Sequence, residues 1–153
     1  MLYRPYTPED FDPLYAIEEL CFEPPSRFSR RYMRQLVSSP NAATWVAEEN
    51  GRLQGFAIVE CNEDEGELAA YIQTIEVLPE ARGQGAGREL LNHIEGSARL
   101  AGAAVVWLHV ESENTAAIRL YEAHGYCCEG RQENYYPSGH AALIYIKRFN
   151  CLI

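Results

Sequence analysis

The chain has little positive charge and no long apolar run, and these absences exclude whole classes of protein. Lys and Arg number 13 against 22 Asp and Glu, which gives 153 residues a net charge of −9 at pH 7. That charge opposes nonspecific binding to the phosphates of nucleic acids. No apolar run approaches the roughly 20 residues of a membrane-spanning helix, and residues 1–5 lack the apolar core of a signal peptide. We therefore predict a cytoplasmic protein that binds neither nucleic acid nor membrane.

The cysteines lack the spacing of a zinc site or a disulfide framework. There are five, an odd number, with Cys127 and Cys128 adjacent and no C-x-x-C pattern. We expect reduced thiols and no metal. A hydrophobic content of 47% with 23% charged residues is typical of a globular protein. The length and the absence of linkers or repeats predict one domain over residues 1–153, as a monomer or homodimer.

Apolar periodicity and turn residues predict a mixed α/β domain. Four helices are predicted. The first follows a cap at residues 7–10 and continues through Cys21, the second spans 29–38, the third spans 85–101, and the fourth runs from an Asn114 cap to Gly125. The predicted strands are 2–6, 44–49, 53–60, 68–77, 105–110, 127–133 and 141–148. Asn50-Gly51 is a strong hairpin signal. An acidic turn is predicted over residues 62–67.

The segment PEARGQGAGR, residues 79–88, lies between a predicted strand and a predicted helix. Its three glycines allow a tight turn that brings backbone N–H groups against an anion. The first turn of the following helix adds unpaired N–H donors and a partial positive charge. Arg82 and Arg88 flank the loop and can donate charge-assisted hydrogen bonds to phosphate oxygens. The segment therefore suits a diphosphate, and the alternative is a glycine-rich turn without a ligand.

The spacing of this loop distinguishes among diphosphate ligands. A dinucleotide fingerprint starting at Gly83 would need a glycine at position 88, which is Arg88, and an acidic residue near position 103. A P-loop would need Lys followed by Ser or Thr, and the chain has Arg88-Glu89. The remaining pattern, Arg82-x-x-Gly85-x-Gly87, resembles the acetyl-CoA signature of the GNAT N-acetyltransferases.

This resemblance implies the GNAT acyl-CoA N-acyltransferase fold, a central mixed β-sheet flanked by about four helices, with acetyl-CoA as cosubstrate. The backbone of residues 75–77 would pair with the pantetheine arm. A second family motif, Asn-x-x-Ala-x-x-x-Tyr, matches Asn114, Ala117 and Tyr121. The residues implied to bind acetyl-CoA are Ile75, Glu76, Val77, Arg82, Gly83, Gln84, Gly85, Ala86, Gly87, Arg88, Asn114, Ala117 and Tyr121.

Three side chains are candidates for catalysis. Tyr121 would protonate the departing CoA thiolate, since a phenol of pKa near 10 can donate to a thiolate whose thiol has a pKa near 8.5. Tyr71 and His109 occupy positions similar to those of one branch of the protein N-terminal (Nα) acetyltransferases, where a Tyr and a His hold the water that takes the amine proton. Without the resemblance, Asn114 is an ordinary helix cap, Tyr71 and Tyr121 are rim and core aromatics, and His109 is a structural histidine.

The substrate assignment rests on two further segments. Tyr135 and Tyr136 resemble the peptide-clamping tyrosines of these families, and a solvent-edge aromatic pair is the alternative. Phe22, Glu23 and Pro24 stand where those families have Phe-Pro, and Glu23 would favour a cationic or polar first residue.

The predicted function is acetyl transfer from acetyl-CoA to the α-amine at a protein or peptide N-terminus, by direct attack in a ternary complex. The bacterial ribosomal-protein alanine acetyltransferases usually carry Glu where His109 stands. The alternatives are a GNAT enzyme acting on a small-molecule amine or a lysine side chain, and a noncatalytic acetyl-CoA sensor.

Overall fold

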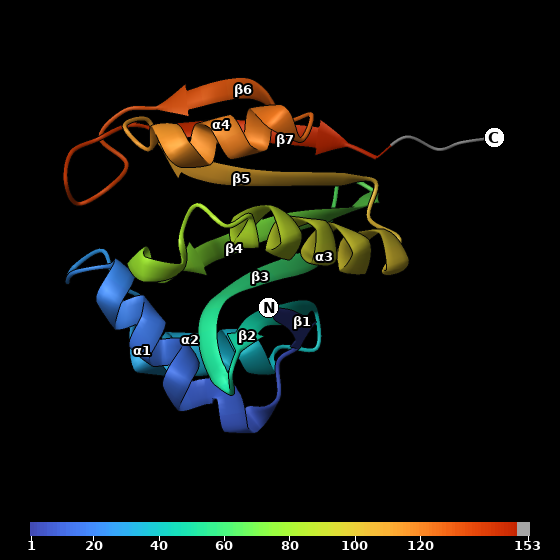
Figure 1. Ribbon diagram of the computed structural model, residues 1–153. Helices are drawn as coiled ribbons and strands as arrows, with labels where there is room; N and C mark the ends of the chain where they lie inside the picture. The colour runs from blue at the N-terminus through green and yellow to red at the C-terminus, as the bar shows by residue number, and fades with distance from the viewer. Residues whose placement is uncertain (150–153) are drawn as a thin grey trace.

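The computed structural model describes residues 1–149, which form a seven-stranded mixed sheet with helices on both faces (Figure 1). The strands are β1 (Leu2–Pro5), β2 (Ala42–Glu49), β3 (Arg52–Asp64), β4 (Glu67–Val77), β5 (Val105–Glu111), β6 (Cys127–Gln132) and β7 (Ala142–Arg148). Their order is β1-β2-β3-β4-β5-β7-β6, and every neighbouring pair is antiparallel except the parallel pair β4 and β5. The helices are α1 (Phe11–Cys21), α2 (Arg30–Ser38), α3 (Ala86–Leu100) and α4 (Thr115–Ala123), with 3-10 turns η1 (Pro8–Asp10) and η2 (Pro79–Ala81).

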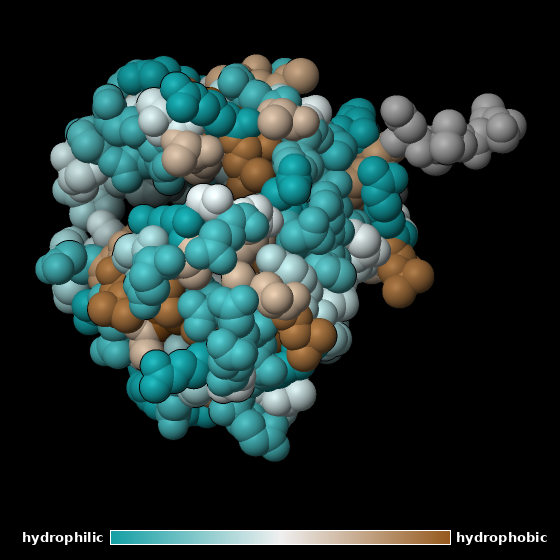
Figure 2. Space-filling view, in the orientation of Figure 1, coloured by the Kyte–Doolittle hydropathy of each residue, from teal (hydrophilic) through white to brown (hydrophobic). Residues whose placement is uncertain are grey.

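Each face of the sheet has its own apolar core. On one face, α1 and α2 pack against β2 and β3 through residues that include Leu14, Met33 and Phe56, all fully buried. On the other face, α3 and α4 cover the middle of the sheet, with Leu90 of α3 and Tyr121 of α4 in one cluster. The outer surface seen in Figure 2 is mostly hydrophilic, and its apolar side chains gather in separate patches. None of the helices within residues 1–149 is long and apolar enough to cross a membrane.

Local sequence signals form most of these elements as expected. Ser29 caps α2 by accepting a hydrogen bond from the Tyr32 N–H at 3.0 Å, and Asn114 caps α4 through the Ala117 N–H at 3.2 Å. Asn50 adopts a left-handed φ of 54° in the β2–β3 hairpin. The mixed sheet with four α-helices confirms the predicted fold.

The predicted acidic turn over residues 62–67 is wrong in its extent. Strand β3 continues to Asp64, and its ladder with β4 runs to the pair Asp64 and Glu67. The reversal is confined to Glu65 and Gly66, whose φ values are 50° and 86°. A two-residue turn of this type matches the twist of the flanking strands, so pairing extends farther than acidic composition suggested.

Strands β4 and β5 separate over half of their length. Their parallel pairing covers only Ala69 to Tyr71 opposite Val105 to Trp107, although β4 continues to Val77 and β5 to Glu111. In the β3–β4 ladder, Ile58 pairs with Thr74 and Val59 with Ile72, which leaves Gln73 as a bulged extra residue. A bulge bends its strand and reverses the alternation of side chains beyond it. Beyond the bulge, β4 therefore has one edge without a partner strand.

Gly55 is required where β3 passes the end of β4. A Cβ atom at this position would lie 2.6 Å from the Glu76 carbonyl oxygen. We expect Gly55→Ala to lower the free energy of unfolding by roughly 1–3 kcal/mol, because the two backbones must move apart. Gly96→Ala is the matched control: this exposed helical position has open space around it, so we expect a gain of about 0.5–1 kcal/mol. Urea unfolding of both variants measures the difference, and equal stabilities would contradict the close approach.

Candidate active site

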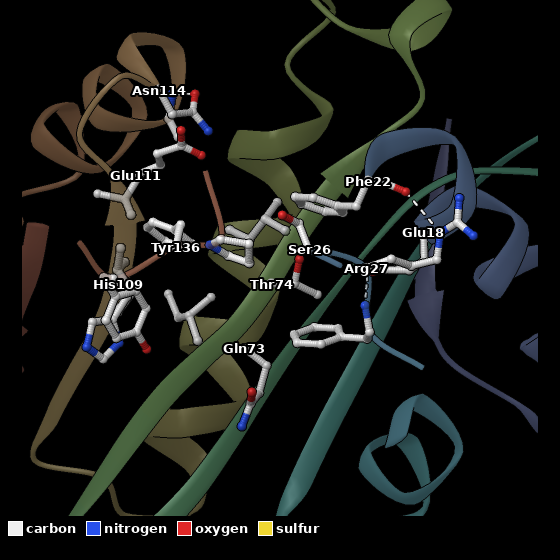
Figure 3. A pocket seen from close by; sticks show the side chains of 18 of the residues that line it. Glu18, Phe22, Ser26, Arg27, Gln73, Thr74, His109, Glu111, Asn114 and Tyr136 are labelled. Carbon is white, nitrogen blue, oxygen red and sulfur yellow. Dashed lines mark hydrogen bonds between the residues drawn. The ribbon is translucent and has the colours of Figure 1, made fainter. Parts of the chain in front are cut away.

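A cavity of about 760 Å³ lies where β4 and β5 separate, and both faces of the sheet contribute to its lining. From the α1 and α2 face come Glu18, Phe22, Phe28 and Tyr32. Figure 3 shows His109, Glu111, Asn114 and Tyr136 on one side, Glu18, Phe22, Ser26 and Arg27 on the other, and Gln73 and Thr74 of β4 between them. From the opposite face, α4 contributes Ala117 and Tyr121, with Asn114 as its cap. Residues from both layers of helices therefore line the cavity.

Tyr71 and His109 meet at this opening from neighbouring strands. The Tyr71 hydroxyl lies 2.8 Å from His109 Nδ1. The ring of Tyr135 stacks on the His109 imidazole, with centroids 4.7 Å apart and planes inclined by 11°. Trp107 packs edge-on against both Tyr71 and His109. The imidazole is thus held by a hydrogen bond on one nitrogen and by an aromatic ring on its face.

Burial sets the protonation of this pair. Burial raises the pKa of Tyr71 to about 12, with smaller contributions from the nearby Tyr135 and Tyr32. Burial also lowers the pKa of His109 below its ordinary 6.5. At neutral pH the phenol therefore keeps its proton and the imidazole is neutral, so the Tyr71 hydroxyl donates to His109 Nδ1.

Tyr121 reaches the same cavity from α4. Its side chain is buried among the core residues, and burial raises the pKa of its hydroxyl. No side-chain hydrogen bond to this hydroxyl forms within residues 1–149, so the phenolic proton is available to a group in the cavity. Asn114 both caps α4 and lines the cavity, so the two interpretations of this residue are compatible.

The glycine loop has the geometry of an anion cradle. Gly83 and Gly85 have φ values of 80° and 84°, a region that favours glycine. Within the described chain, the backbone N–H groups of residues 83–88 donate to no protein acceptor. The Arg88 guanidinium lies over the loop, with one nitrogen 3.7 Å from the place of a Cβ on Gly85. Free donors at a helix N-terminus suit a phosphate.

Arg82 has a different position from Arg88. Its Nε donates to the Val77 carbonyl oxygen at 2.9 Å, and its terminal nitrogen lies 3.7 Å from the Cys21 sulfur. The Arg82 side chain therefore lies against the end of β4. The Leu78 N–H donates to the carbonyl oxygen of Gln54 in β3. Because backbone N–H groups alternate between the two edges of a strand, those of Val77 and Ile75 point the other way, toward the gap. These are the free backbone donors that the pantetheine prediction requires.

The predicted substrate residues divide into two groups. Phe22, Tyr135 and Tyr136 line the cavity, whereas Glu23 and Pro24 are exposed and lie outside its lining. The buried carboxyl group in its lining is that of Glu18, which was not predicted from the sequence as a site residue. Its signal was an acidic residue on the apolar face of α1, only 1% exposed. Phe28, Tyr32 and Glu111 were also missed, because only the fold brings them to this opening.

No group of three or more His, Cys, Asp and Glu side chains is arranged for a metal ion in the described part of the chain. The described residues provide a glycine loop with free N–H groups, a strand edge without a partner, and three acid–base side chains, Tyr71, His109 and Tyr121, that are uncharged at neutral pH.

Comparison with known proteins identifies the family. The sequence profile of the Acetyltransferase (GNAT) family matches residues 11–126. The chain therefore belongs to the GNAT family, as the loop and the Asn114 motif predicted.

Individual relatives share the chain to different extents. The ribosomal protein bS18-alanine N-acetyltransferase of Escherichia coli K12 is 39% identical over 90 residues, which cover 59% of this chain and 58% of that protein. N-alpha-acetyltransferase 30 of Schizosaccharomyces pombe is 32% identical over 131 residues, 85% of each chain. The crystal structure of the Escherichia coli ribosomal-protein-S18-alanine N-acetyltransferase superposes with a TM-score of 0.86 at 27% identity, covering 99% of this chain and 95% of that one.

The pKa values of His109 and His140 should be shifted in opposite directions from that of an ordinary histidine. Burial lowers the pKa of His109, whereas a hydrogen bond to the Glu111 carboxylate raises the pKa of His140 above the ordinary 6.5. We expect an NMR titration of the imidazole signals to place His109 below 6.5 and His140 above it. Glu111→Gln should lower the pKa of His140 and leave that of His109 in place. Identical titrations of the two imidazoles would contradict the described environments.

Proposed function

We propose that this protein transfers the acetyl group of acetyl-CoA to the α-amine of a protein N-terminus. The observation that carries the proposal is the cavity between β4 and β5. Tyr121 lies on its α4 side, and the Tyr71–His109 pair with the aromatic wall lies on its α1 and α2 side. The glycine loop is outside the cavity lining, at the N-terminus of α3. Two molecules that enter from opposite faces would meet at the gap between the strands.

The residues present fit acetyl-CoA. The free N–H groups of residues 83–88 would hold its diphosphate, with Arg88 above them, and the gap-facing N–H groups of β4 would hold the pantetheine. Acetyl-CoA supplies a thioester carbonyl, which is the acyl donor. The protein's part is to orient that carbonyl, exclude water and manage two protons.

The proton path follows from the hydrogen bond between Tyr71 and His109. As the amine forms its bond to the acetyl carbon, its proton passes directly or through one water to the Tyr71 oxygen. The phenolic proton of Tyr71 moves to His109 Nδ1, 2.8 Å away, so the charge ends on the imidazole. Tyr121 gives its own proton to the departing thiolate. The Val77 N–H in the gap would stabilise the carbonyl oxygen.

An α-amine is the acceptor that this base suits best. An α-amine of pKa near 8 is about a tenth neutral at pH 7, whereas a lysine side chain of pKa near 10.4 is about 3 kcal/mol harder to deprotonate. A neutral imidazole of lowered pKa is matched to the easier task. The named activities of the bS18-alanine and N-alpha-acetyltransferase relatives support the same acceptor.

The acceptor is tested by acetyl-CoA-dependent thiol release with short peptides that differ in their first residue. Each peptide has a matched control that is blocked at its N-terminus and contains lysine. We expect turnover with free N-termini only. Turnover confined to blocked lysine peptides or small amines would replace the proposed acceptor, and acetyl-CoA binding without turnover on any amine would support a sensor instead.

The roles of the two acid–base groups are tested separately. We expect Tyr121→Phe to lower kcat roughly 10²-fold with little change in the KM for acetyl-CoA, because only the donated proton is lost.

Wild-type kcat should fall as the pH drops through the His109 pKa, below 6.5, since protonation removes the base. His109→Phe should lower kcat and remove this acidic limb. The control is Tyr3→Phe, whose ring stacks on His93 outside the cavity lining, and we expect it to keep wild-type kinetics.

A further inference from the structure

Two glutamate side chains from different elements are buried together beside the cavity. Glu18 of α1 is 1% exposed and Glu76 of β4 is 3% exposed. Each uses one carboxyl oxygen within the protein: Glu18 Oε2 accepts from the Phe28 N–H at 2.9 Å, and Glu76 Oε2 accepts from the Thr74 hydroxyl at 2.8 Å. The second oxygen of each carboxyl is buried without any other partner in residues 1–149.

Two neighbouring carboxyl groups can hydrogen-bond to each other only if one of them is protonated, because an ionised carboxylate has no proton to donate. The two groups lie within hydrogen-bonding reach, and burial together with Glu18 raises the pKa of Glu76 well above its ordinary value. Like charges this close do not both ionise in a buried site. The other titratable neighbours are the Cys21 thiol on α1 and the Arg82 guanidinium, which is directed to the Val77 carbonyl and the Cys21 sulfur.

We propose that Glu18 and Glu76 share one proton and act as positioning residues, joining the wall that faces the acceptor to the strand that faces acetyl-CoA. This inference rests on the proposed acetyl transfer for its kinetic consequence. Neither carboxyl takes part in the chemistry, since their free oxygens are buried and Tyr71 and His109 accept the amine proton.

The wall in question is the segment from Phe22 to Phe28 between α1 and α2. Phe28 is held on both sides of its backbone: its N–H donates to Glu18, and its carbonyl accepts from the Tyr15 hydroxyl at 2.9 Å. Arg27 adds a hydrogen bond from its Nε to the Phe22 carbonyl, visible as a dashed line in Figure 3. Phe22 and Phe28 both line the cavity, so the position of Glu18 sets the shape of this wall.

The other half of the pair is in β4. Glu76 lies between Ile75 and Val77, whose N–H groups face the gap, and its carbonyl approaches Gly55 too closely for a Cβ. The strand cannot move without disturbing that contact. The shared proton thus fixes α1 and its loop against a strand that is in tight backbone contact with Gly55, so the acceptor wall is in place before a peptide binds.

The first test measures amide hydrogen exchange of Phe28, relative to that of Tyr32, whose N–H donates to Ser29. In the wild type we expect at least tenfold greater relative protection at pH 6 than at a pH high enough to ionise both carboxyls, where the two carboxylates repel. Glu76→Gln replaces the protonated carboxyl by a permanently neutral donor, so protection should persist at both pH values. Glu76→Ala should lose protection at both, although the Phe28 N–H donates to Glu18 and not to Glu76.

Glu19→Gln is the matched control, because Glu19 is the exposed neighbour of Glu18 on the same helix and the substitution removes the same charge. We expect it to reproduce wild-type exchange.

In kinetic assays, Glu76→Ala should raise the peptide KM about tenfold, with a smaller change in kcat. Unchanged Phe28 exchange in folded Glu76→Ala, or the same pH dependence in Glu76→Gln, would overturn the pair. If the wild type turned over no amine, the acetyl transfer would fail while the exchange experiment would still decide the pair.

Discussion

The separation of β4 from β5 is the feature on which the rest of the structure depends. Parallel pairing stops at Tyr71 and Trp107, and the bulge at Gln73 bends β4 immediately beyond that point. A continuous sheet would pair every backbone group of these strands and would close the route between its two faces. The bulge instead leaves N–H groups for a ligand and creates the cavity. It also places Tyr71 at the last paired position, where it meets His109.

Burial supplies the acid–base properties of the opening. One physical effect, the loss of solvation, raises the pKa of Tyr71 and Tyr121 and lowers the pKa of His109. The phenols therefore hold protons at neutral pH and the imidazole can accept one. No second charged group is needed to produce this arrangement. The same loss of solvation keeps one proton on the Glu18–Glu76 pair. Although the protein has a net charge of −9, these two carboxyl groups behind the Phe22–Phe28 segment are therefore not both ionised.

The net negative charge of the protein opposes the approach of an anionic ligand to the glycine loop. An anionic protein repels an anionic ligand over long distances, and charge screening limits this repulsion to about 10 Å. At contact distance, in the proposed function, the free N–H groups of residues 83–88 and the Arg88 guanidinium would attract the diphosphate against that repulsion. If the protein acetylates an amine as proposed, the remaining negative charge would attract that amine in its cationic form.

The sequence by itself determined what depends on neighbours along the chain. Hairpin and capping residues such as Asn50 and Ser29 act within a few positions, and the loop and Asn114 motifs have fixed spacings, so the elements and the family could be predicted. The extent of β3 was not predictable, because ladder pairing with β4 overrode acidic composition. Only the tertiary structure decided which groups share the cavity. Glu18 rather than Glu23 lines it, and Glu76 meets Glu18 across two elements, because burial and contact between α1 and β4 exist only after the layers pack.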